Sequence, residues 1–394
     1  MPEFETALYE KLPDGSARCG ICERRCVIKS GGLGWCRTRK NRGGKIYSTS
    51  YGEVSTRNVA PIEAKPVFHF FPGSRWLSLG SVGCNFRCSG CQNWEIAHFN
   101  PEHGLAEPQP GESQGAESQA AACGPGDVRT EPMEPRKVVA LAKEAGCKGI
   151  SWTYNEPTMW LEYTARVNEL AKKEGLYTNY VTNGYMTRAA LDLVGPNLDV
   201  FRVDVKGFSP EFYSKIADIR DFTPVLENAL RAKSKWDMHV EVVTNVIPGL
   251  NDTDVELGRL ATWIATGLGK RTPWHLTRFV PYLELSDVPC TPIATLDRAR
   301  QIGFDVGLLY VYTGNVAGHP GENTYCPKCG RVVIGRHHFS LIAYNLKTES
   351  EPGAGQSAQP AQDWRRRGHA GADAGAPGPA RCVYCGQRVA GVFE

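Results

Sequence analysis

Short apolar runs rich in β-branched and aromatic residues recur through the middle of the chain, and more polar stretches separate them. The runs lie at residues 76–82, 149–154, 177–183, 199–206, 239–247 and 274–280, with one more at 308–314. Apolar residues at helical spacing fall between them, at residues 136–145, 157–173, 226–235 and 252–266. This alternation predicts an α/β fold with a parallel sheet and outer helices, either an open sheet or a full or partial barrel.

Two segments interrupt this pattern. Residues 100–133 and 348–380 are rich in Pro, Gly, Glu, Gln and Ser and have almost no apolar periodicity. Such segments bury too little apolar surface to offset the entropy lost on ordering. We therefore predict two flexible insertions.

The charge balance favours no particular class of partner. The 394 residues include 45 Lys and Arg against 42 Asp and Glu, a net charge of +3. This gives no general electrostatic reason to expect a nucleic acid or a membrane partner. The N-terminus lacks a basic stretch followed by an apolar run, and no apolar stretch is long enough to span a bilayer. We expect a cytoplasmic protein.

Cysteine is the unusual residue, with 14 copies. In a reducing compartment, clustered thiols indicate metal ligands rather than disulfides. Three residues, Cys123, Cys147 and Cys290, stand alone. The other eleven form three groups, namely Cys19, Cys22, Cys26 and Cys36; Cys84, Cys88 and Cys91; and the pairs Cys326/Cys329 and Cys382/Cys385.

The middle group lies in GCNFRCSGCQNW, directly after the first predicted strand. Its spacing is Cys-x3-Cys-x2-Cys, with no fourth cysteine close behind. Three thiolates on a four-iron cluster leave one iron open to a further ligand, which is what chemistry requires. The alternative is a zinc site, but structural zinc usually has four ligands in paired Cys-x2-Cys spacing. We therefore predict a catalytic iron–sulfur cluster.

Polar residues end the next three predicted strands, where a parallel barrel places its ligand groups. Asn155 and Glu156 follow the second strand, and Asn183 follows the third. On the fourth strand, Asp204 and Lys206 point to the same side because alternate residues share a face. An unpaired buried charge is costly, so we expect an ion pair or a bound charged ligand there. Each residue alone is equally consistent with a helix cap or a satisfied turn.

The flanking cysteine groups predict two further metal sites. The N-terminal four thiols lie within 18 residues and suit either zinc or an auxiliary [4Fe–4S] cluster, which their spacing does not separate. The C-terminal pairs, in CPKCG and CVYCG, resemble the halves of a zinc ribbon with 52 residues between them. Extending the closed loop that far costs roughly 1 kcal/mol, against about 10 kcal/mol or more from structural zinc.

The three-cysteine spacing resembles the radical S-adenosylmethionine (SAM) superfamily. Longer strings are similar to the radical SAM member of the AmmeMemoRadiSam system, itself similar to pyruvate formate-lyase activating enzymes. These strings include CERRCVI, GCNFRCSGCQNWEIA, WTYNEPT, RVDVKGF and ENTYCPKCG. The resemblance implies a partial (β/α)6-type TIM-like barrel at residues 66–318, with a Cys-rich N-terminal module at 1–50 and a zinc-ribbon-like C-terminal module at 319–394.

The resemblance also implies roles for the site residues. Cys84, Cys88 and Cys91 would hold a [4Fe–4S] cluster, while Asp204 and Lys206 would contact the ribose and carboxylate region of SAM. Glu156, with Asn155, would meet the SAM ammonium, and Asn183 would line the same cofactor site. The chain departs from the family where Tyr154 and Asn155 replace two glycines of a Gly-Gly-Glu element. It also has Gly90 where an aromatic or aliphatic residue usually contacts adenine, so we expect that contact from Phe86 or a later strand.

The expected function is reductive cleavage of SAM to a 5′-deoxyadenosyl radical that activates or modifies a protein partner. The alternatives are a radical enzyme acting on a small molecule or RNA, and a non-catalytic iron–sulfur or zinc binding module. The resemblance makes MEMO-type and AMMECR-type proteins candidate partners, and the chemistry needs a reductant such as flavodoxin or ferredoxin. RNA has only a local basic cluster in its favour, so a nucleic acid partner is not expected. The sequence does not predict the substrate.

Overall fold

The computed structural model describes residues 4–100, 105–106, 128–348 and 378–393, and its core is one eight-stranded sheet. The strand order is β18-β17-β16-β15-β14-β13-β9-β8. Seven neighbouring strands, β9 to β18, are parallel, and β8 joins the edge antiparallel to β9. The bounds are β8 Thr56–Pro61, β9 Arg75–Gly80, β13 Gly149–Trp152, β14 Tyr177–Thr182, β15 Val200–Asp204, β16 His239–Val246, β17 Trp274–Arg278 and β18 Val311–Gly314.

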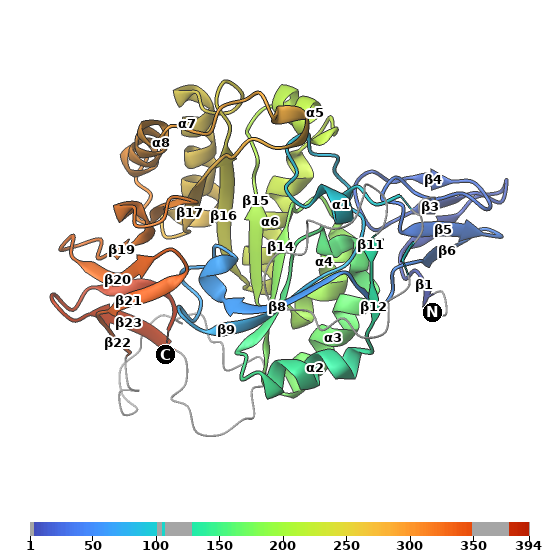
Figure 1. The fold of residues 1–394 in the computed structure, drawn as a ribbon, viewed down its shortest axis with the longest axis horizontal. Coiled ribbons are helices and arrows are strands. Elements are labelled where there is room, and N and C mark those ends of the chain that lie inside the picture. Colours follow the sequence, from blue (N-terminus) through green and yellow to red (C-terminus); the bar gives the residue numbers. More distant parts are fainter. Residues whose placement is uncertain (1–3, 101–104, 107–127, 349–377, 394) are drawn as a thin grey trace.

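Helices connect the parallel strands and cover the outside of the sheet (Figure 1). Several begin at a Ser or Thr whose side chain accepts a backbone N–H, as Thr187, Ser209 and Thr253 do. The bounds are α1 Trp94–Ala97, α2 Pro135–Glu144, α3 Leu161–Lys173, α4 Arg188–Val194, α5 Pro210–Ala217, α6 Thr223–Trp236, α7 Asp254–Trp263 and α8 Ile293–Asp305. Short 3₁₀ turns lie at η1 Ile62–Ala64, η3 Pro157–Trp160, η4 Gly195–Asn197, η6 Leu283–Leu285 and η7 Pro320–Glu322, and a π-helical turn, η5 Ile264–Gly269, follows α7.

The predicted α/β architecture is confirmed, because every apolar run became a strand of one parallel sheet. The strands are buried on both faces, which is why they appear as nearly continuous apolar runs. Four helices escaped prediction, α1, α4, α5 and α8, of which the first three are short. Among the strand pairs in the described parts of the chain, none joins β8 to β18.

A small β-rich module lies at each end of the chain, on opposite sides of the core (Figure 1). The N-terminal strands are β1 Phe4–Glu5, β2 Tyr9–Lys11, β3 Ala17–Cys19, β4 Val27–Ile28, β5 Arg39–Arg42, β6 Lys45–Ser48 and β7 Glu53–Val54. The C-terminal strands are β19 Thr324–Tyr325, β20 Val332–His337, β21 Ser340–Tyr344, β22 Leu346–Thr348, β23 Gly378–Cys382 and β24 Arg388–Phe393. Each module forms two three-stranded sheets.

The predicted insertions fall largely outside the described residues, but their edges were placed too widely. Strands β10 Leu105–Ala106, β11 Val128–Arg129 and β12 Glu131–Pro132 lie within 100–133, and β12 pairs with β7. Met133 is buried in the main core. Similarly, Thr348 and Ala380 pair in the C-terminal sheet. Composition alone did not mark where the ordered strands resume.

Candidate active site

The three-cysteine loop leaves β9 at the carboxyl end of the parallel sheet, and the side chain of Asn155 holds its start. The Asn155 amide accepts the N–H of Ser81 at 3.0 Å and donates to the carbonyls of Val82 and Gly83 at 3.1 and 2.9 Å. These bonds tie the end of β13 to the beginning of the loop. The residue predicted to bind the cofactor therefore positions the loop through its side chain.

Other elements hold the rest of the loop. The Ser89 N–H donates to the carbonyl of Ile216 at the end of α5, and the Ser89 carbonyl accepts from Glu284 in η6. At the start of the loop, Gly83 has a φ of +81° and lies against the N-terminal module, where a Cβ would come within 2.6 Å of the Cys36 carbonyl oxygen. This close approach requires glycine at that position.

The thiols of Cys84, Cys88 and Cys91 lie on this loop, and each of the three residues is partly buried. Burial raises the pKa of each thiol, that of Cys91 to about 11. At Cys84 the Glu156 carboxylate raises the pKa further, while at Cys88 the ammonium of Lys206 opposes the effect of burial. Buried thiolates are stable only beside positive charge, which a metal centre supplies. One loop supplies all three thiols, so these residues together could offer a metal centre three thiolate ligands.

Glu156 joins the ends of two strands. One carboxylate oxygen accepts from the N–H and hydroxyl of Thr158 and from the hydroxyl of Thr182, and the other accepts from the Asn183 N–H at 2.8 Å. The contact with Thr158 caps η3, so the helix-cap alternative holds for this residue. The predicted contact with the SAM ammonium would use the remaining acceptor capacity of the second oxygen.

Asn183 contacts the loop directly. Its side-chain nitrogen donates to the Asn85 side chain at 2.7 Å and lies 3.9 Å from the Cys84 sulfur, within the range of an N–H···S hydrogen bond. Hydrogen bonds to the sulfur ligands are one way in which a protein sets the potential of an iron–sulfur cluster. The predicted site residue thus lies beside the first cysteine of the loop.

β15 ends at Asp204, and Lys206 follows two residues later in the chain. The Lys206 ammonium lies 3.8 Å from the Asp204 carboxylate, which also accepts from Arg202 at 2.8 Å. Burial alone would lower the pKa of Lys206, but the charges of Asp204 and then Cys88 hold it above its ordinary value. The ammonium therefore faces both the carboxylate and the cysteine loop, with the charge pairing expected from the sequence.

The structure corrects the expectation for Phe86. Its ring is buried and packs against the rings of Tyr185 and Tyr213, so it belongs to the core. Gly90 lies against Leu285 and Phe279, since a Cβ on Gly90 would be 2.9 Å from the first and 3.4 Å from the second. These two apolar side chains occupy the space where the family usually has a side chain before the third cysteine. Neither was identified from the sequence as a neighbour of Gly90, because both are distant from it in the chain.

A second feature that the sequence concealed is the backbone at Tyr154, which has a φ of +72°. Glycine favours this region, and the resembling element has glycine there. The position therefore keeps the glycine-like conformation although its residue has changed. Strained backbone of this kind tends to lie at functional sites.

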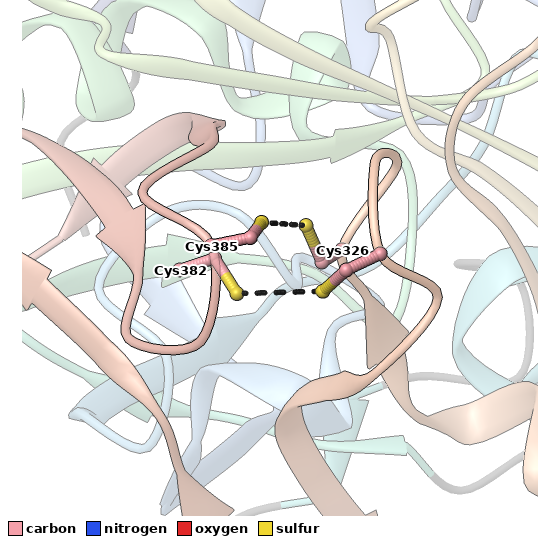
Figure 2. Close-up of side chains that lie close together, drawn as sticks. Cys326, Cys382 and Cys385 are labelled. Carbon is pink, nitrogen blue, oxygen red and sulfur yellow. Dashed lines mark hydrogen bonds between the residues drawn. The ribbon is translucent and has the colours of Figure 1, made fainter.

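The C-terminal cysteines converge as a zinc ribbon requires (Figure 2). The sulfurs of Cys326 and Cys385 lie 3.6 Å apart, and those of Cys329 and Cys382 lie 3.8 Å apart. Four sulfurs at about 2.3 Å from a tetrahedral zinc ion would be separated by about 3.8 Å. In both knuckles a Gly four residues after the first cysteine donates its N–H to that cysteine's carbonyl. This group can therefore hold a single metal ion, and the histidines between the pairs are not needed.

The N-terminal cysteines surround a common cavity instead. Cys19, Cys22, Cys26 and Cys36 all line it, together with Arg39 and Asn85. Arg39 is one of the basic residues near these cysteines, and it is buried and pairs with Glu162 at 2.8 Å. It is thus no part of a surface available to RNA.

Comparison with known proteins decides the family. Residues 79–261 match the radical SAM superfamily, and this segment runs from β9 into α7 and includes all three loop cysteines. The chain belongs to the radical SAM superfamily. It is therefore an enzyme whose family implies SAM and a [4Fe–4S] cluster as cofactors.

One relative of this radical SAM chain matches most of its length, and two solved structures match smaller parts. An uncharacterized protein of Methanocaldococcus jannaschii, MJ0808, is 39% identical over 88% of this chain and 96% of its own length. A domain of pyruvate-formate lyase-activating enzyme from Bacteroides vulgatus is 18% identical, with a TM-score of 0.37 over 42% of this chain and 99% of that domain. A radical SAM methyltransferase from Sphaerobacter thermophilus is 15% identical, with a TM-score of 0.42 over 64% and 71% of the two chains.

Within the described part of the radical SAM chain, every helix is too short or too polar to cross a membrane.

Proposed function

We propose that this chain cleaves SAM reductively at a [4Fe–4S] cluster on Cys84, Cys88 and Cys91, and that the resulting 5′-deoxyadenosyl radical acts on a protein partner. The observation that carries the proposal is the three-cysteine loop at the carboxyl end of the parallel sheet, where Asn183 lies 3.9 Å from the Cys84 sulfur and the Lys206 ammonium, 3.8 Å from Asp204, interacts electrostatically with the Cys88 thiol. A cation there is placed to bind the carboxylate of SAM while the cofactor meets the open iron. The cluster supplies the electron for cleavage.

The residues of the chain orient and enclose this chemistry. Asn155 holds the start of the loop, Glu156 joins the ends of β13 and β14, and Asn183 contacts the sulfur of Cys84. A non-catalytic binding module would not need these polar strand ends beside the cysteine loop. We infer a one-electron donor of the flavodoxin or ferredoxin class as the reductant.

A protein substrate is supported by the resemblance to pyruvate formate-lyase activating enzymes. Within this proposal, MEMO-type and AMMECR-type proteins are the partners to try first. We further propose that the C-terminal cysteines hold structural zinc, since their sulfur separations suit that ion.

The test is an anaerobic assay of the reconstituted, reduced protein with SAM. Replacing Cys84, Cys88 and Cys91 together by Ala should abolish 5′-deoxyadenosine formation, while circular dichroism stays that of the wild type because the strands do not depend on the loop. Cys290→Ala is the matched control, since this cysteine stands apart from the three groups and should leave the product yield unchanged. Formation of 5′-deoxyadenosine by the triple variant would overturn the proposal.

A further inference from the structure

The spacing of the N-terminal thiols differs from that of a zinc site. In the C-terminal group, all four sulfurs lie within 4.8 Å of one another. Across the described ranges of the chain, no other three His, Cys, Asp or Glu ligand atoms meet that limit, so no three of the N-terminal sulfurs do. The catalytic loop shares this wider spacing. Each thiolate of a four-iron cluster binds a different iron, so its sulfurs lie farther apart than the sulfurs on one zinc ion.

The four N-terminal cysteines line one cavity. A zinc ion would draw four sulfurs to about 2.3 Å from their common centre, so that they would lie about 3.8 Å apart. As the thiols now stand, they are too far apart to share one zinc ion. The remaining walls of the cavity include the apolar side chains of Ile21, Ile28 and Met159.

One buried donor on the cavity wall is without a partner. Arg39 is 1% exposed, and its other guanidinium nitrogens bind Thr6, Glu162 and the Met159 carbonyl. Its Nε has no hydrogen-bond partner among the residues that the structure describes. An unsatisfied buried N–H is costly, and a sulfur acceptor in the cavity would satisfy it. The carboxylate of Glu162 offsets the charge of Arg39, so the guanidinium does not depend on an anion in the cavity for neutrality.

The cavity adjoins the catalytic loop. Asn85, the residue after Cys84, lines it, and the Asn85 carbonyl accepts from the Nε of Arg24, which also lines it. Arg87 joins the same two regions through the carbonyls of Cys84 and Trp35. A group bound by the N-terminal cysteines would therefore lie one residue away from the catalytic cysteines.

We propose that Cys19, Cys22, Cys26 and Cys36 bind a second iron–sulfur cluster of the four-iron type, with the Arg39 Nε donating a hydrogen bond to one of its sulfurs. The cluster closes the N-terminal module against the catalytic loop. The proposal is independent of SAM cleavage, because it rests on a separate set of ligands.

The test separates the two clusters by composition. Full-length protein in which Cys84, Cys88 and Cys91 are all Ala is reconstituted anaerobically with iron and sulfide, and its metals and sulfide are counted. We expect about four iron and four sulfide per chain with the visible absorption of thiolate-bound iron. Replacing Cys22 and Cys36 by Ser in that background should remove them, whereas Cys290→Ser should not.

A wild-type measurement covers the case in which a variant does not fold. The reconstituted wild type should contain about eight iron per chain, twice the number for one four-iron cluster. Zinc in place of this second set of irons, or two iron and two sulfide in the triple variant, would overturn the proposal. The yield of 5′-deoxyadenosine from the wild type is measured separately, so failure of the second cluster is distinct from failure of SAM cleavage.

Discussion

At the scale of single residues, the polar strand ends divide their contacts between the protein and the cofactor site. The Asn155 side chain joins the end of β13 to the cysteine loop, and the Glu156 side chain joins the ends of β13 and β14. Lys206 differs, because its ammonium has only a 3.8 Å pair with Asp204 while it lies close to the loop thiols. It is thus the charged side chain best placed to meet the carboxylate of SAM.

Replacing Lys206 by Met tests that contact. The change keeps much of the length of the side chain but removes its charge. A charge-assisted hydrogen bond contributes about 1.5–3 kcal/mol, so SAM affinity should fall roughly ten- to a hundredfold. SAM binding is measured by its effect on the electron paramagnetic resonance spectrum of the reduced cluster. Lys143→Met, on the exposed α2, should leave affinity unchanged, and equal affinity in both variants would make Lys206 a structural partner of Asp204.

Replacing Gly90 by Leu tests the packing before the third cysteine. The new side chain would collide with Leu285 and Phe279, so the variant should lose about 1–3 kcal/mol of unfolding free energy. Adding Leu285→Ala should restore part of the loss by making space. Gly258→Ala, in a roomy position of α7, should be neutral or slightly stabilising. Urea unfolding provides the measurement, and an undisturbed Gly90→Leu variant would show that this space is empty.

At the scale of elements, the two C-terminal knuckles build one site although a long segment separates them. The paired strands β22 and β23 bring the ends of that segment together, with Thr348 opposite Ala380. The knuckles themselves are closed by backbone hydrogen bonds within each Cys-x2-Cys-Gly turn. The geometry of the site therefore depends on the strands and knuckles rather than on the segment between them.

Replacing residues 350–376 by a four-residue Gly-Ser turn should keep the zinc content and slightly raise stability. Shortening the loop this far lowers the entropic cost of closing it by about 1–2 kcal/mol, which stabilises the folded state. Zinc analysis and thermal unfolding of the two proteins provide the comparison. Loss of zinc in the shortened chain would assign the removed segment a structural role.

At the scale of the whole molecule, the two modules contact different segments next to the sheet. The N-terminal module contacts the cysteine loop, through the Cys36 carbonyl at Gly83 and Arg24 at Asn85. The C-terminal module packs on the segment that precedes β9, where Phe71 and Val392 share a backbone hydrogen bond. The proposed zinc therefore stabilises the fold away from the chemistry, whereas the proposed second cluster adjoins it.

His69 makes the attachment of the C-terminal module sensitive to acid. Its ring binds the Ala390 carbonyl and the Tyr312 hydroxyl, and burial lowers its pKa to about 4 from 6.5, although Glu241 acts in the opposite direction. The unfolded chain therefore binds the proton first as pH falls. Stability from this residue is complete above pH 6.5 and is lost between pH 6.5 and about 4, by about 3 kcal/mol.

The measurement is urea unfolding of the wild type and of His69→Gln at several pH values in that window. The variant should be less stable at pH 7 but should lose less on acidification, because it lacks the titrating ring. Parallel pH profiles of the two proteins would show that other groups near His69, such as Glu241, cause the acid sensitivity.

Local sequence was sufficient for much of the molecule. Buried parallel strands must be apolar along their whole length, so β9 to β18 were visible as runs, and the expected charge pairing joins Asp204, the last residue of β15, to Lys206. The spacing of the three loop cysteines likewise indicated a cluster with an open iron, because ligands from one short loop must be close in the chain.

The tertiary structure decided whatever depends on residues distant in sequence. Spacing could not tell zinc from an iron–sulfur cluster at the N-terminal cysteines, because that choice depends on how far apart the folded chain holds the sulfurs. It also could not show that Leu285 fills the space at Gly90, or that the Asn155 amide binds the loop. These contacts arise only when separate strand ends meet, since packing is set by neighbours in space rather than along the chain.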